Sequence, residues 1–313
     1  MLAPVRGALA VSTDMLLEGR HFFADVDPES LGHKALAVNL SDLAAMGASP
    51  KAFTLALALP AVDEAWLTAF SRGLFGLADE YRCELVGGDT TRGPLNLCIT
   101  IMGEVDPSLA LRRDGARAGH DLWVSGNLGG AAWAVAHRQS RGDWARPAAL
   151  ASTPFEAALL ALHRPQPRIA LGRALLGVAS AAIDLSDGLA GDLHHVLQQS
   201  SASAGQPLAA RVDLTALPMH PVLRGLSPEV QYRFALAGGD DYELLFTASS
   251  ELRATLQAIA DRLGLPLARI GAIEEAASSL EKTPRLRWID ACGQAVTLAL
   301  QAHDHFLTPS SPG

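Results

Sequence analysis

The sequence predicts an α+β protein that consists of two αβ domains, residues 1–115 and 116–313. Three observations support this prediction. With 313 residues, of which 49% are hydrophobic, the chain exceeds the size at which a single core is usual. Its first third alternates strand-like and helix-like patterns in the order β-α-β-α-β-β. A Gly- and Ala-rich stretch at 115–119 then precedes a new strand pattern, and we place the domain boundary there.

The first domain begins with an apolar strand pattern at 8–17. A helix is expected over 28–46, because Asp27 can cap its first turn and Gly47 can end it. The apolar residues of this helix recur every three or four positions and form a stripe that also includes Asp42. The Asp42 carboxylate is therefore expected to point inward.

Three strand patterns and one helix pattern complete this domain. Residues 51–59 and 95–105 alternate large apolar residues with smaller ones, as half-buried strands do. Between them lie an amphipathic helix at 62–81 and a short strand at 83–86, which we expect to run into a turn at 87–89.

The second domain is predicted to be another αβ unit. Strands are expected at 121–125, 181–185 and 243–247, and helices after Gly130, within 150–179 around a break at the prolines 165 and 167, at 189–199 and at 250–263. Residues 200–207 are expected to form a flexible loop and residues 309–313 a disordered tail.

Charge and composition argue against several classes of partner. The formal net charge is -8, Lys and Arg are dispersed, and 5% of the residues are aromatic. Nucleic acid or an anionic membrane surface would favour a basic patch, so we expect a small-molecule substrate and neither of those partners. No stretch reaches the length of a membrane span, and no signal-peptide pattern begins the chain.

The cysteines indicate a reducing environment. Cys83, Cys98 and Cys292 are widely spaced and form no C-x-x-C pair. Their odd number and their spacing favour neither a disulfide framework nor a thiolate metal site. We therefore expect the protein in the cytoplasm.

The main functional signal is a set of five aspartates in Gly-, Ser- and Thr-rich segments: Asp14, Asp42, Asp89, Asp184 and Asp187. Hard oxygen ligands without a His or Cys cluster are what a Mg²⁺-nucleotide site requires. Glycines beside the carboxylates allow the backbone to approach a phosphate closely. We expect these carboxylates to hold more than one Mg²⁺ ion for phosphoryl transfer.

The aspartates also have purely structural explanations, of which the one for Asp89 is weaker. Asp187 could cap a helix and Asp184 could belong to a turn, although the two could converge on one ion while Ser186 contacts a phosphate. Asp14 could end a strand, and Asp42 could be buried against an arginine.

Other motifs give weaker signals. His21 could contact a substrate phosphate, but a lone histidine in a loop is more often solvated. Lys34 is expected to be a surface or intersubunit charge rather than a catalytic base. No P-loop and no protein-kinase motif set occurs, and the glycines at 126–130 lack the spacing of a dinucleotide fingerprint.

The motifs combine into a pattern that extends over nearly the whole chain. Its main segments are Ser12-Thr13-Asp14, Asn39-Leu40-Ser41-Asp42, Gly87-Gly88-Asp89-Thr90-Thr91-Arg92-Gly93, Asp184-Leu185-Ser186-Asp187-Gly188, Gly238-Gly239-Asp240-Asp241-Tyr242-Glu243 and His303-Asp304-His305-Phe306. This pattern resembles the thiamine-monophosphate kinase family. The combination is highly specific.

The resemblance implies a fold, a reaction and a set of site residues. The fold would be that of aminoimidazole ribonucleotide synthetase, with the N-terminal domain forming a homodimer interface. The reaction would be ATP-dependent phosphorylation of thiamine monophosphate to thiamine diphosphate by direct in-line transfer, without a covalent protein nucleophile. The implied residues are, for Mg²⁺, the five aspartates with Ser12 and Thr13; for ATP, Gly88, Asp89, Arg113 and Ser186; and for thiamine monophosphate, His21, Asp240 and Phe306.

Two departures from the family pattern concern the site. The family normally has a first helix and a strand with a Gly-Asp-Asp motif ahead of the Ser12-Thr13-Asp14 segment, and this sequence contains neither. We expect a shortened start rather than an impaired enzyme, because the later motifs are intact. Asp240 stands where the family often has Glu, so its side chain is one methylene shorter.

Two alternatives to this function stay open from the sequence. One is another ATP-dependent synthetase of the same superfamily, although the segments 18–22 and 39–42 argue against it. The other is a catalytically impaired dimer that binds nucleotides or thiamine phosphate.

Overall fold

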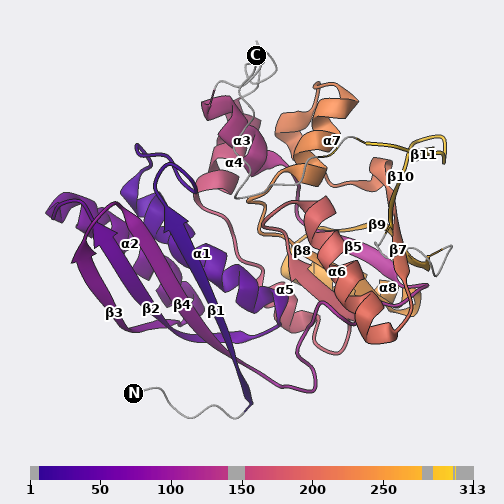
Figure 1. Cartoon of the computed structure of the whole chain (residues 1–313), viewed down its shortest axis with the longest axis horizontal. Helices are drawn as coiled ribbons and strands as arrows, with labels where there is room; N and C mark the ends of the chain where they lie inside the picture. The colour runs from indigo at the N-terminus through magenta and orange to yellow at the C-terminus, as the bar shows by residue number, and fades with distance from the viewer. Residues whose placement is uncertain (1–6, 140–151, 277–284, 299, 301–313) are drawn as a thin grey trace.

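The computed structural model describes residues 7–139, 152–276, 285–298 and 300. Figure 1 shows two β-sheets side by side, with helices around and between them. We call the first the N-terminal sheet; its strand order is β1-β4-β2-β3. The elements of this half are β1 (Ala8–Leu17), α1 (Pro28–Ala45), β2 (Ser49–Leu59), α2 (Glu64–Tyr81), β3 (Glu84–Arg92) and β4 (Asn96–Val105).

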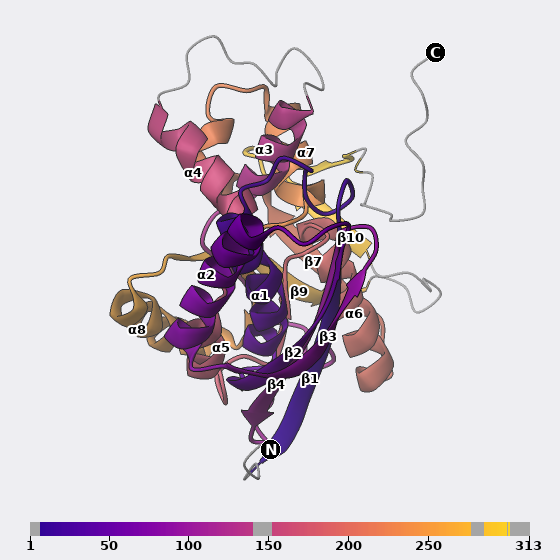
Figure 2. The same cartoon turned by 90° about the vertical axis from the view of Figure 1, so that its left-hand side faces the viewer.

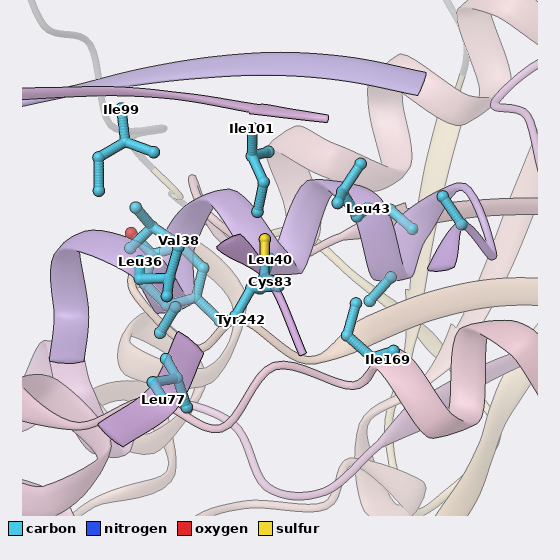
Figure 3. Close-up of a cluster of buried hydrophobic side chains, with 14 of the residues drawn as sticks. Leu36, Val38, Leu40, Leu43, Leu77, Cys83, Ile99, Ile101, Ile169 and Tyr242 are labelled. Atoms are coloured by element: carbon cyan, nitrogen blue, oxygen red, sulfur yellow. The ribbon is translucent and has the colours of Figure 1, made fainter. Parts of the chain in front are cut away.

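Helix α1 begins and ends as the sequence predicts. Asp27 accepts a hydrogen bond from the backbone N–H of Ser30 at 2.9 Å, and Gly47 follows the last turn with a φ of 69°. The apolar stripe predicted for α1 is buried, and nearly all of its other side chains are buried as well. Figure 3 shows the reason: side chains of β4 pack on one side of the helix, and Ile169 and Tyr242 from the second half of the chain pack below it.

Two glycines bring α1 and α2 into close contact. A Cβ at Gly32 would lie 2.0 Å from the carbonyl oxygen of Phe70, and a Cβ at Gly73 would lie 1.8 Å from that of Glu29. Any side chain at either position would push the helices apart. The pair of helices therefore covers one side of the N-terminal sheet as a compact layer, seen edge-on in Figure 2.

Strand β3 is longer than the sequence suggests. The predicted turn at 87–89 is wrong, because the strand continues to Arg92 in parallel pairing with β2. Gly88 has a φ of 153°, and a Cβ there would lie 1.9 Å from the carbonyl oxygen of Leu55. The glycine is thus needed for strand pairing as well as for any approach of a ligand.

The other side of the N-terminal sheet, which we call the open face, is exposed in the single chain. Alternate residues of β1 point toward it, and among them are Leu9, Val11, Met15 and Leu17, which are 38–54% exposed. A row of large apolar side chains at the surface is typical of an interaction site.

The second sheet, which we call the C-terminal sheet, has the strand order β11-β10-β7-β9-β5-β8-β6 among the described residues. The strands and helices of this half are β5 (Asp121–Ser125), α3 (Gly130–Arg138), α4 (Ser152–His163), α5 (Ile169–Ala174), β6 (Ala181–Asp184), α6 (Leu189–Ala204), β7 (Leu208–Asp213), α7 (Pro228–Ala237), β8 (Leu244–Ala248), α8 (Arg253–Leu263), β9 (Leu267–Glu275), β10 (Arg285–Ile289) and β11 (Ala295–Val296).

The predictions for this half are confirmed for β5, β6 and β8 and for the helices α3 to α5 and α8. The flexible loop expected at 200–207 is wrong in its first part, because α6 continues to Ala204. Ser200 is fully buried there, accepts a hydrogen bond from the N–H of Ala116 at 3.0 Å and donates one to the carbonyl of Arg113 at 2.9 Å. Strands β7 and β9 to β11 and helix α7 lacked a clear signal in the sequence.

The two halves join through α1, which packs on α5, β6 and α4 as well as on the N-terminal sheet. The boundary between residues 115 and 116 stays a prediction; it falls between β4 and β5, where the chain passes from one sheet to the other. In the described part of the chain, no helix combines the length and apolarity that crossing a membrane requires. The tail expected at 309–313 lies outside the described residues.

Candidate active site

A cavity of ≈ 1140 Å³ lies between the two halves of the chain. Its wall is formed by the end of β1, the loop that follows, α1, α3, the end of α4, α7 and the turns after β6 and α7. The polar side chains of this wall include Asp14, Arg20, His21, Ser30, Lys34, Gln139, His163, Ser186, Asp187, Glu229, Tyr232, Arg233, Asp240 and Tyr242. Apolar side chains such as Phe22, Val26, Leu31 and Phe234 complete it.

Three of the predicted aspartates meet beside this cavity. Asp14 comes from β1, Asp42 from α1 and Asp184 from the end of β6. Ser12 donates a short hydrogen bond to Asp42, and Ser41 donates one to Asp184 at 2.7 Å. We call Asp14, Asp42 and Asp184 the acidic cluster.

The electrostatics of the acidic cluster are unfavourable in the absence of a cation. Burial, followed by the charges of Asp42 and Asp184, raises the pKa of Asp14 to about 7. Burial and then the charge of Asp42 raise the pKa of Asp184 to about 7, although the Ser41 hydroxyl and Arg113 act in the opposite direction. Crowded carboxylates of this kind favour either protonation or a bound cation.

The chemistry of these donors fits Mg²⁺. They are hard oxygen ligands, and Mg²⁺ is commonly held by a few carboxylates together with water and phosphate oxygens. Within the residues that the structure describes, no group of three or more His, Cys, Asp or Glu side chains is arranged so that it could hold a metal ion. The remaining ligands would therefore come from water, from phosphate or from another chain.

Asp184 is the last residue of β6, and the turn that follows carries Ser186 and Asp187, which line the cavity. The structure adds a residue that the sequence analysis missed. Asp192, in the first turn of α6, is 2% exposed and accepts a hydrogen bond from the backbone N–H of Asp187 at 3.2 Å. Burial and then the charges of Asp184 and Asp187 raise its pKa to about 7. In the sequence, the only signal that could have identified Asp192 was its position five residues after Asp187.

A second group of polar residues lies on the α1 side of the cavity. Lys34 forms an ion pair with Asp240, with 3.1 Å between Nζ and Oδ2, and the Tyr242 hydroxyl donates to Oδ1 of the same carboxylate at 3.1 Å. The prediction that Lys34 is a surface charge is wrong, because its side chain is 4% exposed. Sequence reasoning failed here because α1 is enclosed on all sides.

The remaining predicted ligand residues are placed as follows. His21 lines the cavity, and its Nδ1 accepts a hydrogen bond from the N–H of Leu17 at 3.0 Å. Arg113 is exposed, and its charge opposes part of the rise in the pKa of Asp184. Phe306 lies outside the described residues.

Asp89 and Thr13 lie apart from the acidic cluster. In the register of the N-terminal sheet, Met15 is opposite Cys98, Cys98 is opposite Ala56, and Ala56 is opposite Asp89. Residues opposite one another project from the same face of a sheet, so Asp89 shares the open face with the exposed Met15. Thr13 also faces that side, with its hydroxyl 2.8 Å from that of Thr100.

Comparison with known proteins gives the family. Residues 2–105 match the model for the N-terminal domain of AIR synthase related proteins. The thiamine-monophosphate kinase of Escherichia coli strain K12 is 44% identical over 308 residues, which are 98% of this chain and 89% of that protein. The chain belongs to the thiamine-monophosphate kinase family. The resemblance expected from the sequence is thereby confirmed.

Solved structures support the same assignment. The crystal structure of the thiamine-monophosphate kinase from Stenotrophomonas maltophilia K279a has a TM-score of 0.81 and 44% identity, covering 92% of this chain and 86% of that one. A structure described as AaThiL complexed with AMPPCP and TMP has a TM-score of 0.77 and 28% identity, covering 95% and 87%. The α+β fold of the aminoimidazole ribonucleotide synthetase type, expected for a thiamine-monophosphate kinase, is therefore confirmed.

Proposed function

We propose that this protein phosphorylates thiamine monophosphate to thiamine diphosphate with ATP. Membership of the thiamine-monophosphate kinase family supports this, and so does the name of the related structure that holds AMPPCP and TMP. The observation that carries the proposal is the acidic cluster at the edge of a large cavity. It combines a place for cations with room for a small organic phosphate.

The acidic cluster would hold Mg²⁺, together with Ser12, Asp187 and the hydroxyl of Ser186 nearby. Mg²⁺ bound there would neutralise the oxygens of the phosphates. The protein side chains then have two tasks, to hold the two phosphorylated molecules in line and to exclude competing water. No activated Ser or Cys is needed, because an oxygen of the substrate phosphate attacks the γ-phosphorus of ATP and ADP leaves.

The cavity wall suits the organic part of thiamine monophosphate. Phe22, Leu31 and Phe234 offer apolar surface for its rings, while His21 and Asp240 offer polar contacts. Arg113 and Ser186 would face ATP on the side of the acidic cluster. Gly88 and Asp89 stay proposed ligands, although β3 places them outside the cavity wall of the single chain. Phe306 stays a proposed ligand outside the described residues.

A homodimer that uses the open face would complete the site. The open face exposes Leu9, Val11, Met15 and Leu17, which a second copy could cover, and Asp89 projects from the same face. Two-fold symmetry would then allow Asp89 and Thr13 of one chain to approach the acidic cluster of the other. Burial of these side chains would stabilise the dimer by about 25 cal/mol per Å² of apolar surface.

We also propose that the enzyme acts in the cytoplasm. Support comes from the three thiols, all of which are unpaired. Cys83 is buried, and burial followed by the charge of Glu84 raises its pKa to about 12, so that it stays a protonated thiol.

The deciding experiment is a turnover assay with thiamine monophosphate, ATP and Mg²⁺, in which thiamine diphosphate and ADP are both quantified. Aminoimidazole ribonucleotide precursors and selenide serve as competing substrates of related synthetases. Production of thiamine diphosphate and ADP in equal amounts would support the proposal. ATP turnover with another acceptor alone, or binding without turnover, would contradict it.

A further inference from the structure

Lys34 is a buried cation in the wall of the cavity. Its side chain is 4% exposed, and its Nζ lies 3.1 Å from Oδ2 of Asp240, whose own side chain is 32% exposed. Both residues line the cavity. The ammonium is thus largely withdrawn from solvent, while the carboxylate that it touches still reaches the cavity.

The position of the Asp240 carboxylate is fixed from several sides. Lys34 holds Oδ2, and the Tyr242 hydroxyl donates to Oδ1 at 3.1 Å. The backbone N–H of Asp240 donates to the carbonyl of Ser186 at 2.9 Å. Asp240 and Tyr242 have φ values of 67° and 49°, which non-glycine residues rarely adopt. A side chain that points into an open cavity would not need so many constraints for folding alone.

Helix α1 connects this group to the acidic cluster. Lys34 and Ser41 are seven residues apart, close to two full helical turns, so they lie on nearly the same side of α1. Lys34 holds Asp240, and Ser41 donates to Asp184 at 2.7 Å. One rigid element therefore sets the separation between the acidic cluster and the Asp240 carboxylate.

We infer that Lys34 is a positioning residue for the thiamine-monophosphate end of the cavity. It holds the Asp240 carboxylate in one orientation and neutralises much of its charge, so that the carboxylate accepts hydrogen bonds from the substrate at a fixed distance from the acidic cluster. This inference rests on the proposed function. It predicts an effect on binding of thiamine monophosphate and little effect on ATP.

The test uses the full chain and four variants: Lys34→Met, Lys34→Arg, Asp240→Asn and the double variant Lys34→Met with Asp240→Asn. Arg72→Met is the matched control, since the Arg72 side chain is 65% exposed, pairs with Glu29 on the helix layer and lies outside both the cavity wall and the open face. KM for each substrate, kcat, the Kd for thiamine monophosphate from calorimetric titration, and the unfolding temperature are measured for each.

Lys34→Met and Asp240→Asn should each raise the KM and Kd for thiamine monophosphate by about tenfold and leave the KM for ATP within about twofold. The double variant should be no worse than either single one, because the two residues act as a unit. Lys34→Arg should recover part of the loss, and Arg72→Met should behave as the wild type.

Three results would overturn the inference. These are an unchanged KM and Kd in a folded Lys34→Met variant, additive losses in the double variant, or an equal loss for ATP and thiamine monophosphate. Turnover by the wild type separates a failure of this inference from a failure of the proposed function. If the wild type turns over thiamine monophosphate but Lys34→Met matches it, only the role of Lys34 fails. If the wild type neither binds nor phosphorylates thiamine monophosphate, both fail.

Discussion

Asp14 and Asp89 project from opposite faces of the same β-sheet. Asp14 faces α1 and belongs to the acidic cluster, whereas Asp89 projects from the open face on the far edge strand. Both belong to the aspartates that the sequence assigns to Mg²⁺. Within one chain the sheet separates them, and a second copy packed on the open face offers a way to bring them together.

Mixing two inactive variants tests this arrangement. Asp14→Asn and Asp89→Asn should each lower kcat by at least about 100-fold, because each removes a charge that faces the phosphates. If each site takes Asp14 from one chain and Asp89 from its partner, subunit exchange between the variants should restore about a quarter of wild-type activity, since half of the dimers then carry one intact site.

The measurement is turnover after co-refolding or co-expression, with light scattering to follow the dimer. Asp261→Asn, on the exposed surface of α8, is the control for loss of a carboxylate. A site shared between chains would be contradicted if a mixture shown to contain mixed dimers were no more active than the separate variants.

Stability without Mg²⁺ should fall as the pH rises from about 4 to about 7. In the folded protein, burial and then the neighbouring carboxylates raise the pKa of Asp14 to about 7, whereas the unfolded value is 3.8. Between these values the folded state binds more protons than the unfolded state, so the free energy of unfolding decreases with pH; outside this window the contribution is constant.

Thermal unfolding in the presence of a chelator, at steps of pH through this window, checks that prediction. Asp14→Asn should show a shallower decrease than the wild type. Added Mg²⁺ should raise the unfolding temperature more above the window than below it. The predicted sign of the pH dependence would be wrong if the unfolding temperature of the wild type rose relative to that of the variant between these pH values.

Arg168→Met should destabilise the fold strongly. Arg168 donates through Nε to Oε2 of Glu243 at 2.6 Å, and the Ser125 hydroxyl donates to the same oxygen at 2.6 Å. Since Glu243 is 5% exposed, the substitution leaves a buried carboxylate without its cation, a change that costs about 3–5 kcal/mol. Urea unfolding measures it, and Arg287→Met in an exposed ion pair is the control. Equal small losses in both variants would refute the distinction.

Gly88→Ala should lower both stability and turnover. The new Cβ would meet the carbonyl oxygen of Leu55 at 1.9 Å, so β3 would have to shift away from β2 and carry Asp89 with it. A loss of about 1–3 kcal/mol is expected from the strained φ and the weakened pairing. Gly76→Ala is the matched control, because a Cβ there meets no atom within 4 Å. A Gly88→Ala variant as stable and active as the control would contradict this account of the glycine.

The sequence by itself determined most of the local structure and the family. The cap at Asp27, the alternation along 95–105 and the turn at Asp184 depend on neighbours in the chain, so their signals are local and were interpreted correctly. The assignment of the five aspartates to Mg²⁺ stays a prediction, which the sequence supports because carboxylates in small, polar segments suit a hard cation.

Only the tertiary structure decided which of these residues meet. Burial of Lys34 depends on a helix enclosed between two sheets, and the face on which Asp89 projects depends on strand register across β1, β4, β2 and β3. Ser200 lies in α6 rather than in a loop, and its hydroxyl bonds to Arg113 and Ala116, which are distant in sequence. Such contacts join segments far apart in the chain, and local periodicity contains no information about them.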